Sequence, residues 1–372
     1  MSLNTMKIFF RVDASIKIGT GHVMRCLALA DELRRQGHQC LFICRNHEGH
    51  LGNLITQKDF ELHVLHTPKQ LGTFANDKAD LAHSDWLEAP WQTDAEQTLR
   101  VLMGHAPDWL IVDHYGLDAK WERSLVHAVG HIMAIDDLAD REHDCALLLD
   151  QNLGREPSDY ETLVPPTCKQ LIGPKYALLR TEFTDLRSVS LKRRRSPKLK
   201  RILISMGGGD RTNVTGKVLK ALSNSGLPPE TELDIVMGNF APHLEAVKKQ
   251  ASKLSFQTAV SISVSDMANR MCAADFSIGG AGSTSWERCC LGLPSIMIVL
   301  ANNQRLIATA LEQTGCAQMS TVEDVDARIR EVIQELKVQS TMLMRMSDKS
   351  QKVCDGQGCM RVVAVLSHED NL

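Results

Sequence analysis

Short apolar segments of strand length alternate with helical patterns in both halves of the 372-residue chain, and glycine-rich turns join several strands to the next helix. The first example runs from a strand at residues 8–12, through a turn containing Gly19 and Gly21, into a helix that begins near Val23. Such alternation is typical of parallel sheets that carry helices on both faces. Because the pattern restarts at residues 201–206, the sequence predicts two Rossmann-like, doubly wound α/β domains in tandem.

His22 stands at the start of the first predicted helix, directly after the glycine turn. The positive end of the helix dipole disfavours an imidazolium there, so the ring tends to stay neutral near pH 7 and able to accept a proton. We therefore predict that His22 is a general base, with Asp13 and Ser15 on the same loop as possible orienting partners. The alternative is an ordinary strand-to-helix turn with a histidine near the cap.

Polar side chains follow three predicted strands, at residues 109–112, 132–135 and 147–149. They are Asp113, His114 and Tyr115 after the first strand, Asp136 and Asp137 after the second, and Asp150, Gln151 and Asn152 after the third. The carboxyl ends of parallel strands border the crevice in which open α/β sheets bind ligands. We expect these side chains to lie near a ligand, although aspartates at strand ends also serve as caps for the next helix.

Two glycine turns in the second half predict a nucleotide site. One follows the strand at residues 201–206, and the other lies between a strand at residues 275–278 and the next helix. Backbone N–H groups of such turns can hold a diphosphate, and a carboxylate about one turn into the helix can accept a hydrogen bond from a ribose hydroxyl. The predicted nucleotide-binding residues are Gly207, Gly208, Gly209, Gly282, Ser283 and Glu287. Asn303 and Gln304 follow the next strand and are expected to face the same crevice.

A basic, polar stretch at residues 188–200 separates the two patterns and includes Lys192, Arg193, Arg194 and Arg195. Because no aromatic residues are interleaved with these charges, we interpret the stretch as a solvated linker rather than a phosphate or nucleic-acid site. The predicted domains are therefore residues 7–187 and residues 201–366. Helical patterns at residues 322–336 and 342–366 are expected to complete the second sheet and pack back across the domain junction.

The composition argues against several classes of function. With 43% hydrophobic residues, 23% charged residues and a net charge of −3, the chain gives no overall signal for nucleic acid or a membrane surface. No apolar run approaches the roughly 18 residues of a membrane-spanning helix. The eleven cysteines form no CxxC pair, and we expect reduced thiols in a cytoplasmic protein. We expect a monomer whose partner is a small molecule.

Two doubly wound sheets in tandem, each with a glycine turn aimed at a central cleft, form the layout of the two-domain nucleotide-sugar enzymes called GT-B. Other nucleotide sites are poorly supported, because no GxGxxG is followed by an acidic residue at dinucleotide spacing and no Walker lysine follows a glycine loop. Histidines and cysteines do not cluster at the spacing of metal ligands, so we predict neither a metal nor a cofactor.

Several sequence blocks occur in a known family's order between residue 7 and about residue 315. They are FRVDASIKIGTGHVMRCLALADEL, IVDHYGLD, IDDLADREHDCALLLDQN, GPKYALLRTEF, SMGGGD and GGAGSTSWERCCLGLPSI with a later NNQ. In this combination the chain resembles the UDP-2,4-diacetamido-2,4,6-trideoxy-β-L-altropyranose hydrolases of pseudaminic acid biosynthesis. The second half is also similar to the UDP-N-acetylglucosamine-binding domain of the lipid-II glycosyltransferase, including the position of Glu287. The first resemblance implies removal of UDP from a UDP-sugar by attack of water at the anomeric carbon, with inversion.

The resemblance also implies roles for individual residues. The family's histidine base matches His22, and its substrate-binding asparagine matches Asn303. The residues implied to bind substrate, each within a matching block, are Asp13, Gly21, Arg25, Tyr115, Asp137, Tyr176, Arg180, Asn303 and Gln304. If His22 is not the base, Asp13 and His114 are the next candidates.

Two other functions share this fold and stay open. A glycosyltransferase would bind a UDP-sugar but release little UDP until an acceptor is added. A binding protein would not turn the ligand over, and His22 would be dispensable. A transferase usually has an apolar acceptor face or a membrane-docking patch, and neither is evident in the first predicted domain. The order of the matching blocks along the chain favours the hydrolase.

Overall fold

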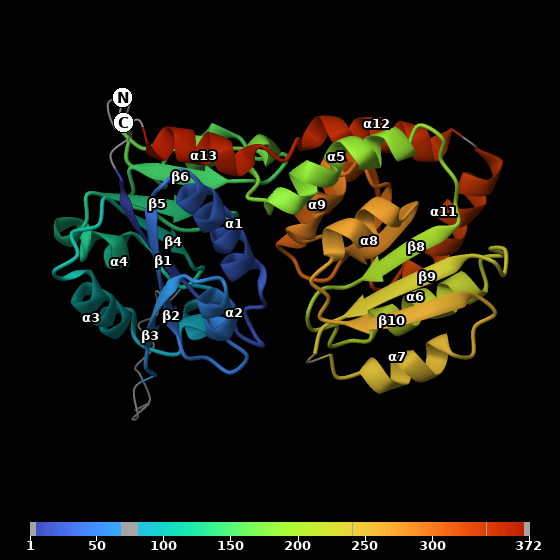
Figure 1. Cartoon of the computed structure of the whole chain (residues 1–372), viewed down its shortest axis with the longest axis horizontal. Coiled ribbons are helices and arrows are strands. Elements are labelled where there is room, and N and C mark those ends of the chain that lie inside the picture. The colour runs from blue at the N-terminus through green and yellow to red at the C-terminus, as the bar shows by residue number, and fades with distance from the viewer. Residues whose placement is uncertain (1–4, 68–80, 240, 340, 368–372) are drawn as a thin grey trace. The chain divides into compact units, whose positions relative to one another are not determined.

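The computed structural model describes residues 5–67, 81–239, 241–339 and 341–367, and it divides into two compact units (Figure 1). The first unit comprises Met1–Leu178 together with Gly358–Leu372, and the second comprises Leu179–Gln357. Each unit is built around one parallel sheet, as the alternating sequence pattern predicts.

The sheet of the first unit contains seven strands within the described residues, in the order β3-β2-β1-β4-β5-β6-β7. They are β1 (Lys7–Val12), β2 (Gln39–Arg45), β3 (Glu61–Leu65), β4 (Trp109–Asp113), β5 (His131–Ile135), β6 (Leu147–Asp150) and β7 (Lys169–Ile172). Neighbouring strands pair in parallel, and β1 lies between β2 and β4. The strand order therefore reverses direction between β1 and β4, which in open α/β sheets marks the ligand-binding crevice.

Both faces of this sheet are covered. The helices of the unit are α1 (Gly21–Arg35), α2 (Gly52–Gln57), α3 (Trp91–Leu102), α4 (Ala119–Arg123) and α13 (Gly358–Leu366). Side chains along β1 alternate, so that Ile8 and Phe10 pack in a core with α1 and α13 while Phe9 joins the core on the other face. Because both faces of the sheet are buried, the sequences of its central strands are nearly continuous apolar runs.

The second unit repeats this arrangement with six strands in its described part, in the order β10-β9-β8-β11-β12-β13. The strands are β8 (Arg201–Ser205), β9 (Glu232–Met237), β10 (Gln257–Ile262), β11 (Phe276–Gly280), β12 (Ser295–Val299) and β13 (Ala317–Thr321). The helices are α5 (Thr181–Arg193), α6 (Val214–Ser223), α7 (Leu244–Ala251), α8 (Met267–Ala273), α9 (Thr284–Cys290), α10 (Gln304–Thr314), α11 (Val325–Val338) and α12 (Met342–Val353). The predicted fold class, two Rossmann-like doubly wound domains, is confirmed.

The division of the chain differs from the predicted boundaries in two places. The basic stretch at residues 188–200 is not a solvated linker, because its first part belongs to α5 and is packed within the second unit. Arg194 is buried there and donates hydrogen bonds to the carbonyls of Met271, Ala274 and Leu291. Periodicity and charge alone do not reveal such backbone partners.

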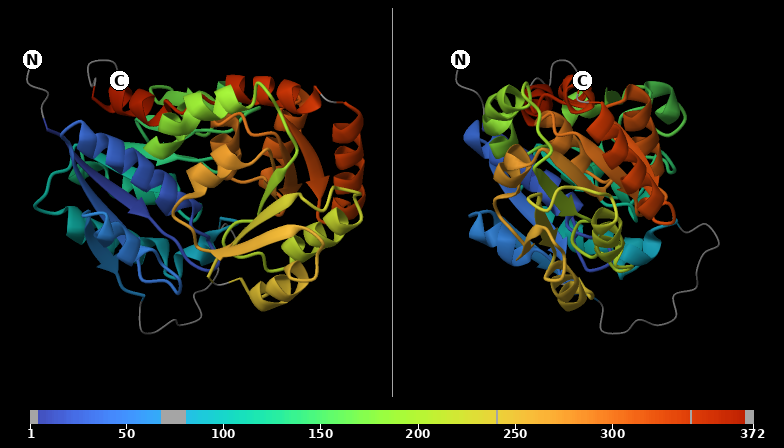
Figure 2. Two further views of the ribbon diagram at one scale, coloured as in Figure 1. Left: turned by 45° about the vertical axis from the view of Figure 1, so that its right-hand side comes forward. Right: turned by 90° about the vertical axis from the view of Figure 1, so that its right-hand side faces the viewer.

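The second difference concerns α13, which belongs to the first unit and not to the second. Its Val362, Val363 and Leu366 are buried in the core that α1 and β1 also form. In Figures 1 and 2, α13 (red) lies over α1 (blue), although the two helices are far apart in the sequence. Gly358 allows this return, because a Cβ at that position would lie 2.1 Å from the carbonyl oxygen of Ala177.

A buried ionic network lies beneath the end of β1. Arg11 pairs with Asp13 at 2.7 Å and with Asp94 at 2.6 Å, and Arg45 pairs with the same oxygen of Asp94 at 2.5 Å. The indole N–H of Trp121 donates to the other oxygen of Asp94 at 3.0 Å. Burial alone would raise the pKa of Asp94, but the adjacent Arg11 and Arg45 hold it below its ordinary value. The network fixes β1, β2 and α3 to one another.

Replacing Asp94 with Asn leaves two buried guanidinium groups with one fewer carboxylate. Removing one partner of a buried ion pair typically costs about 3–5 kcal/mol. We expect Asp94→Asn to lower the midpoint of urea unfolding accordingly. Four tryptophans report on this unit by fluorescence: Trp86, Trp91, Trp109 and Trp121.

The matched control is Asp85→Asn, which breaks the exposed pair between Asp85 and Lys17. Exposed ion pairs contribute at most about 1 kcal/mol, so its midpoint should hardly move. Equal shifts for the two variants would show that the buried network does not stabilise the unit.

Candidate active site

The predicted base lies at the point where the strand order of the first unit reverses. β1 and β4 are adjacent, with Val12 opposite Asp113 in the parallel register. α1 begins at Gly21, and its N-cap residue Thr20 makes no side-chain capping hydrogen bond. The first-turn N–H groups of α1 and the side chains that follow β4 therefore meet at one end of the sheet.

Asp113 holds the imidazole of His22. His22 Nδ1 lies 2.6 Å from one oxygen of Asp113, and both residues are buried. Arg25 donates to the same carboxylate through Nε and Nη2, each at 2.6 Å. Burial alone would raise the pKa of Asp113, but Arg25 and His22 hold it far below its ordinary value. Because this carboxylate stays ionised and accepts, Nδ1 of His22 is the ring nitrogen that donates to it.

A second carboxylate extends this group. Arg25 Nη1 donates to Asp137 at 2.9 Å, and the hydroxyl of Tyr115 donates to the other oxygen of Asp137. Burial, with Asp137 nearby, raises the pKa of Tyr115 well above its ordinary value, so the phenol stays protonated. The structure thus joins four of the predicted residues, His22, Arg25, Tyr115 and Asp137, into one hydrogen-bonded chain through Asp113.

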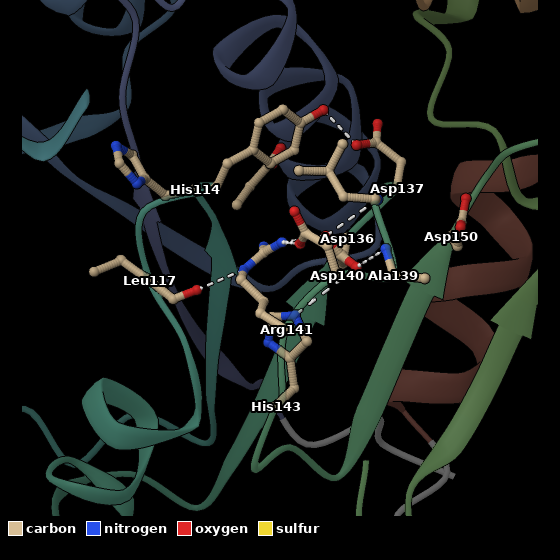
Figure 3. A network of polar contacts seen from close by, with 12 residues as sticks. His114, Leu117, Asp136, Asp137, Ala139, Asp140, Arg141, His143 and Asp150 are labelled. Carbon is tan, nitrogen blue, oxygen red and sulfur yellow. Dashed lines mark hydrogen bonds and ion pairs between the residues drawn. The ribbon is translucent and has the colours of Figure 1, made fainter. Parts of the chain in front are cut away.

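Asp136 has a different role from its neighbour Asp137. Figure 3 shows both at the end of β5, with Arg141 directed toward Asp136. Arg141 donates to Asp136 at 2.6 Å and to the carbonyl of Leu117 at 2.8 Å, and the backbone N–H of Ala139 donates to Asp136 at 2.9 Å. Asp136 therefore fixes the loop that presents Asp137, whose side chain is 15% exposed.

Two aromatic side chains that the sequence did not single out border His22. The ring of Trp86 lies 6.5 Å from that of His22 and 5.5 Å from that of Tyr115, and the ring of His83 lies 4.4 Å from that of Trp86. They lie on or next to a short 3₁₀ segment, Ser84–Leu87, in a region whose sequence is polar and irregular. An irregular segment has no periodicity that would assign its aromatic residues to a site.

The predicted orienting partners of His22 are wrong. Asp13 is fully buried in the ionic network, where it accepts from Arg11 and from the backbone N–H of Arg45. The hydroxyl of Ser15 accepts from the N–H groups of Lys17 and Ile18 and closes the loop. The partner is Asp113 instead: it lies opposite Val12, which packs in the core with α1, whereas the Asp13 carboxylate accepts from Arg11 and Arg45.

Two other residues implied to bind substrate are not part of this hydrogen-bonded chain. Tyr176 belongs to a 3₁₀ segment, Pro174–Tyr176, and packs against the core that contains α13. Arg180 belongs to the second unit, where it pairs with Glu182 at 2.7 Å and lies 3.6 Å from Glu287. Arg180 is therefore a neighbour of the predicted nucleotide residue Glu287.

The two glycine turns of the second unit follow β8 and β11, which are adjacent at the strand-order reversal of this sheet. Gly207 has a φ of +86°, and a Cβ on Gly207 or Gly208 would meet no atom within 4 Å. Gly238 lies behind this turn, where a Cβ would lie 2.1 Å from the carbonyl oxygen of Gly208. Open space thus borders the first turn on one side, and backbone packs tightly on the other.

The helices after these turns differ in their capping. The first N–H groups of α6 are already bonded, since Asp210 accepts from Val214 at 2.7 Å and from Thr215 at 3.0 Å, and Asn213 accepts from Gly216. α9 begins after Ser283 without a side-chain capping bond. The N–H groups of Ser285 and Trp286 in α9 nevertheless donate to the carbonyls of Gly282 and Ser283 at 2.9 and 3.1 Å, so at both turns a phosphate would meet mainly the N–H groups of the turn itself.

Charged side chains surround the second turn. Burial raises the pKa of Glu287 to about 6 despite the nearby Arg180 and Arg288. Arg288 is buried and donates to the carbonyl of Gly280 at 2.8 Å, and its Nη1 has no hydrogen-bond partner among the described residues. Burial lowers the pKa of Arg288 to about 10. A positive charge without a hydrogen-bonded carboxylate thus lies behind the turn.

Asn303 and Gln304 lie at the start of α10. Gln304 accepts from the backbone N–H of Leu300 at 3.0 Å, and its amide nitrogen would lie 3.7 Å from a Cβ on Gly282. Gln304 is therefore next to the second glycine turn, as its position in the sequence predicts, while Asn303 is exposed at the helix start.

The fold and these turns define the class: the chain has a GT-B-like fold with two Rossmann-like α/β domains. Residues 206–357 match the family model of the glycosyltransferase family 28 C-terminal domain. The chain is similar over 99% of its length to the crystal structure of the glycotransferase of kitacinnamycin, all of which is covered, with a TM-score of 0.67 and 16% identity.

Two curated proteins are similar over most of the chain. The UDP-2,4-diacetamido-2,4,6-trideoxy-beta-L-altropyranose hydrolase of Campylobacter jejuni is 29% identical over 83% of this chain and 97% of its own. The UDP-N-acetylglucosamine--N-acetylmuramyl-(pentapeptide) pyrophosphoryl-undecaprenol N-acetylglucosamine transferase of Acidithiobacillus ferrooxidans is 24% identical over 92% of this chain and 93% of its own. The predicted resemblance to the hydrolase is confirmed. These relatives act on UDP-sugars, one as a hydrolase and one as a transferase.

Among the helices that the structure describes, none has the length and apolar content to cross a bilayer.

His114, the alternative base, is buried beside the ionic network, and its Nδ1 accepts from the backbone N–H of Gly116 at 3.0 Å. Burial lowers the pKa of His114 to about 3. The unfolded chain therefore binds a proton below about pH 6.5 that the folded chain does not, and stability present above that pH is lost on acidification. We expect this histidine to contribute a slope of about 1.4 kcal/mol per pH unit between about pH 6 and pH 4.

Urea unfolding of His114→Asn from pH 4 to pH 7.5 measures this contribution, because the asparagine carbonyl can still accept from Gly116. The loss of stability on acidification should be shallower than in the natural chain. The exposed His127 gives the control, and His127→Asn should keep the natural slope. Identical slopes in all three proteins would mean that His114 is protonated in the folded state.

Proposed function

We propose that this protein hydrolyses UDP-2,4-diacetamido-2,4,6-trideoxy-β-L-altropyranose, or a close stereoisomer, to UDP and the free sugar. The observation that carries the proposal is the buried His22–Asp113 pair at the uncapped start of α1, in a chain similar to such a hydrolase. A carboxylate that fixes the tautomer of a histidine is the usual arrangement of a histidine general base.

In the proposed reaction, a water oxygen attacks the anomeric carbon from the face opposite the nucleotide. Nε2 of His22 takes the proton of the water, and the bond between C1 and the phosphate oxygen breaks with its electron pair leaving on UDP. Asp113 holds the Nδ1–H and stabilises the imidazolium that forms. Arg25 keeps Asp113 ionised, and we expect Tyr115 and Asp137, which are joined to Arg25 by hydrogen bonds, to bind the sugar's hydroxyl and acetamido groups.

The nucleotide part of the proposal concerns the second unit. Glycine turns with free N–H groups suit the diphosphate, and Glu287 suits the ribose hydroxyls. The buried guanidinium of Arg288 adds a positive charge behind the second turn. A departing UDP gains negative charge on its β-phosphate, so fixed positive charge and N–H dipoles lower the barrier. The family 28 match over residues 206–357 supports this assignment.

His22→Ala tests the base. Loss of a positioned general base typically slows a reaction about 10²–10⁴-fold. We expect kcat for UDP release to fall by that factor while UDP binding is retained, and Asp113→Asn to give a smaller loss. NMR of the sugar's anomeric signal should report inversion in the natural enzyme. The control His127→Ala changes an exposed histidine and should keep full activity.

A transferase is the second candidate, because the family 28 match and the Acidithiobacillus ferrooxidans relative both belong to that class. It predicts that the natural chain binds the UDP-sugar without releasing UDP until an acceptor is added. Binding without release in water would therefore replace the hydrolase proposal, and release that survives His22→Ala would move the base to another residue.

The proposed role of Glu287 predicts a pH dependence of nucleotide binding. Because its pKa is raised to about 6, Glu287 is ionised above that pH and loses its charge as the pH falls through it. Hydrogen bonds to a charged group contribute roughly 1.5–3 kcal/mol, or about tenfold or more in affinity. Calorimetry with UDP-N-acetylglucosamine, whose phosphates do not titrate between pH 5 and pH 8, should show weaker binding below about pH 6.

Glu287→Gln should bind UDP-N-acetylglucosamine weakly at every pH, and its affinity should not change near pH 6. Glu182→Gln is the matched control, since Glu182 is the other carboxylate beside Arg180 and lies outside the turn. If the affinity of Glu287→Gln fell near pH 6 by the same factor as that of the natural chain, the pH dependence would belong to another group.

A further inference from the structure

A cavity of about 330 Å³ lies in the second unit, away from both glycine turns. Segments from four parts of the unit form it: the end of α5 and the residues after it, the residue before β11, the residue before β12, and α12. The lining residues are Arg193, Arg194, Ser196, Pro197, Lys198, Asp275, Pro294 and Leu343. One wall of this cavity therefore comes from the basic stretch at residues 188–200, which the sequence analysis interprets as a linker.

The charges of the lining are unbalanced. Three side chains, Arg193, Arg194 and Lys198, are cationic, and Asp275 is the one carboxylate. Asp275 is already occupied, because one oxygen pairs with Arg193 and the other accepts from the backbone N–H groups of Lys200 and Arg201 at 2.9 Å each. The cavity therefore carries a net charge of two positive units.

Arg194 is the least compensated of these cations. It is 5% exposed, and it donates Nε to Leu291 and one N–H each from Nη1 and Nη2 to Ala274 and Met271, at 2.8–2.9 Å. Within the part of the chain that the structure describes, three of its five N–H groups have hydrogen-bond partners, and all three partners are neutral carbonyls. Burial, with Arg193 nearby, lowers the pKa of Arg194 to about 10.

Most other buried arginines of the described chain have a carboxylate partner. Arg11, Arg25, Arg45 and Arg141 each pair with a carboxylate at 2.5–2.7 Å. Within the described residues, the buried arginines without such a pair are Arg194 and Arg288. Arg288 lies behind the turn where the diphosphate is proposed to bind. Burying a charge is unfavourable unless the charge is paired. A bound anion would supply the missing partner of the Arg194 guanidinium beside the cavity.

We propose that this cavity binds a small phosphorylated metabolite. Arg193, Arg194 and Lys198 neutralise its phosphate, whose charge of nearly −2 at neutral pH matches the excess charge. The volume corresponds to about ten water molecules at about 30 Å³ each, which is larger than one phosphate requires. Pro197, Pro294 and Leu343 give the remainder an apolar wall, so the ligand carries an organic part.

Calorimetry on the full chain in 150 mM salt tests the proposal with two probes, glucose 6-phosphate and inorganic phosphate. Losing one charge-assisted contact costs about tenfold in affinity or more. Lys198→Ala and Arg193→Gln should each weaken binding of glucose 6-phosphate by that factor. The controls Lys192→Ala and Arg195→Ala remove exposed charges of the same run that do not line the cavity, and they should leave binding unchanged.

Three results would overturn the proposal. Equal weakening by the controls would mean diffuse attraction to the basic run. Displacement of the probe by saturating UDP-N-acetylglucosamine would place the probe in the nucleotide site. If neither probe bound at millimolar concentration, the cavity would not be a site for phosphorylated metabolites.

The two probes also test the apolar wall. Tighter binding of glucose 6-phosphate than of inorganic phosphate would support a ligand with an organic part, and equal affinities would show that the cavity binds phosphate alone. None of these outcomes depends on hydrolase activity.

Discussion

The Asp113 carboxylate accepts three short hydrogen bonds, one from His22 and two from Arg25, and these bonds join α1 to the end of β4. His22 and Arg25 are three residues apart on α1, so they share one helix face and reach one carboxylate together. Asp113 reaches that face only because β4 pairs with β1 in the register that sets it opposite Val12. The packing of β1, β4 and α1 therefore determines the tautomer of one histidine.

Charge is handled differently in the two units. In the first, the buried Arg11, Arg25, Arg45 and Arg141 are neutralised by carboxylates of the same unit. In the second, the buried Arg194 donates to backbone carbonyls, and the buried Arg288 donates to the carbonyl of Gly280 and the hydroxyl of Thr284. Self-contained pairs hold side chains in fixed positions, which suits a base that must be oriented. Unneutralised guanidinium groups provide positive potential, which suits anionic ligands.

Much of this architecture could be predicted from the sequence, because local patterns encode local structure. The strand before His22, the glycine turns and the helix starts all follow from apolar runs, Gly residues and periodicity. The orienting role of Asp113 could not be predicted, since alternation of strands and helices does not give the order of strands in the sheet. The same limit applies to α13, whose apolar face fits either unit, and to Arg194, whose partners are distant carbonyls. Trp86 lies in an irregular segment and has no pattern at all.

The difference between a hydrolase and a transferase of this fold therefore rests on the first unit. A nucleotide-binding second unit is compatible with either reaction, because both require a stabilised UDP leaving group. What differs is the nucleophile that the base activates. In the proposed mechanism, a base held by an ionised carboxylate can deprotonate water as readily as an acceptor hydroxyl, so the side chains around His22 decide which of the two is admitted. Trp86, His83 and Tyr115 form an aromatic border beside the ring. The proposed hydrolysis requires that this border admit water at the attacking position and exclude a larger acceptor.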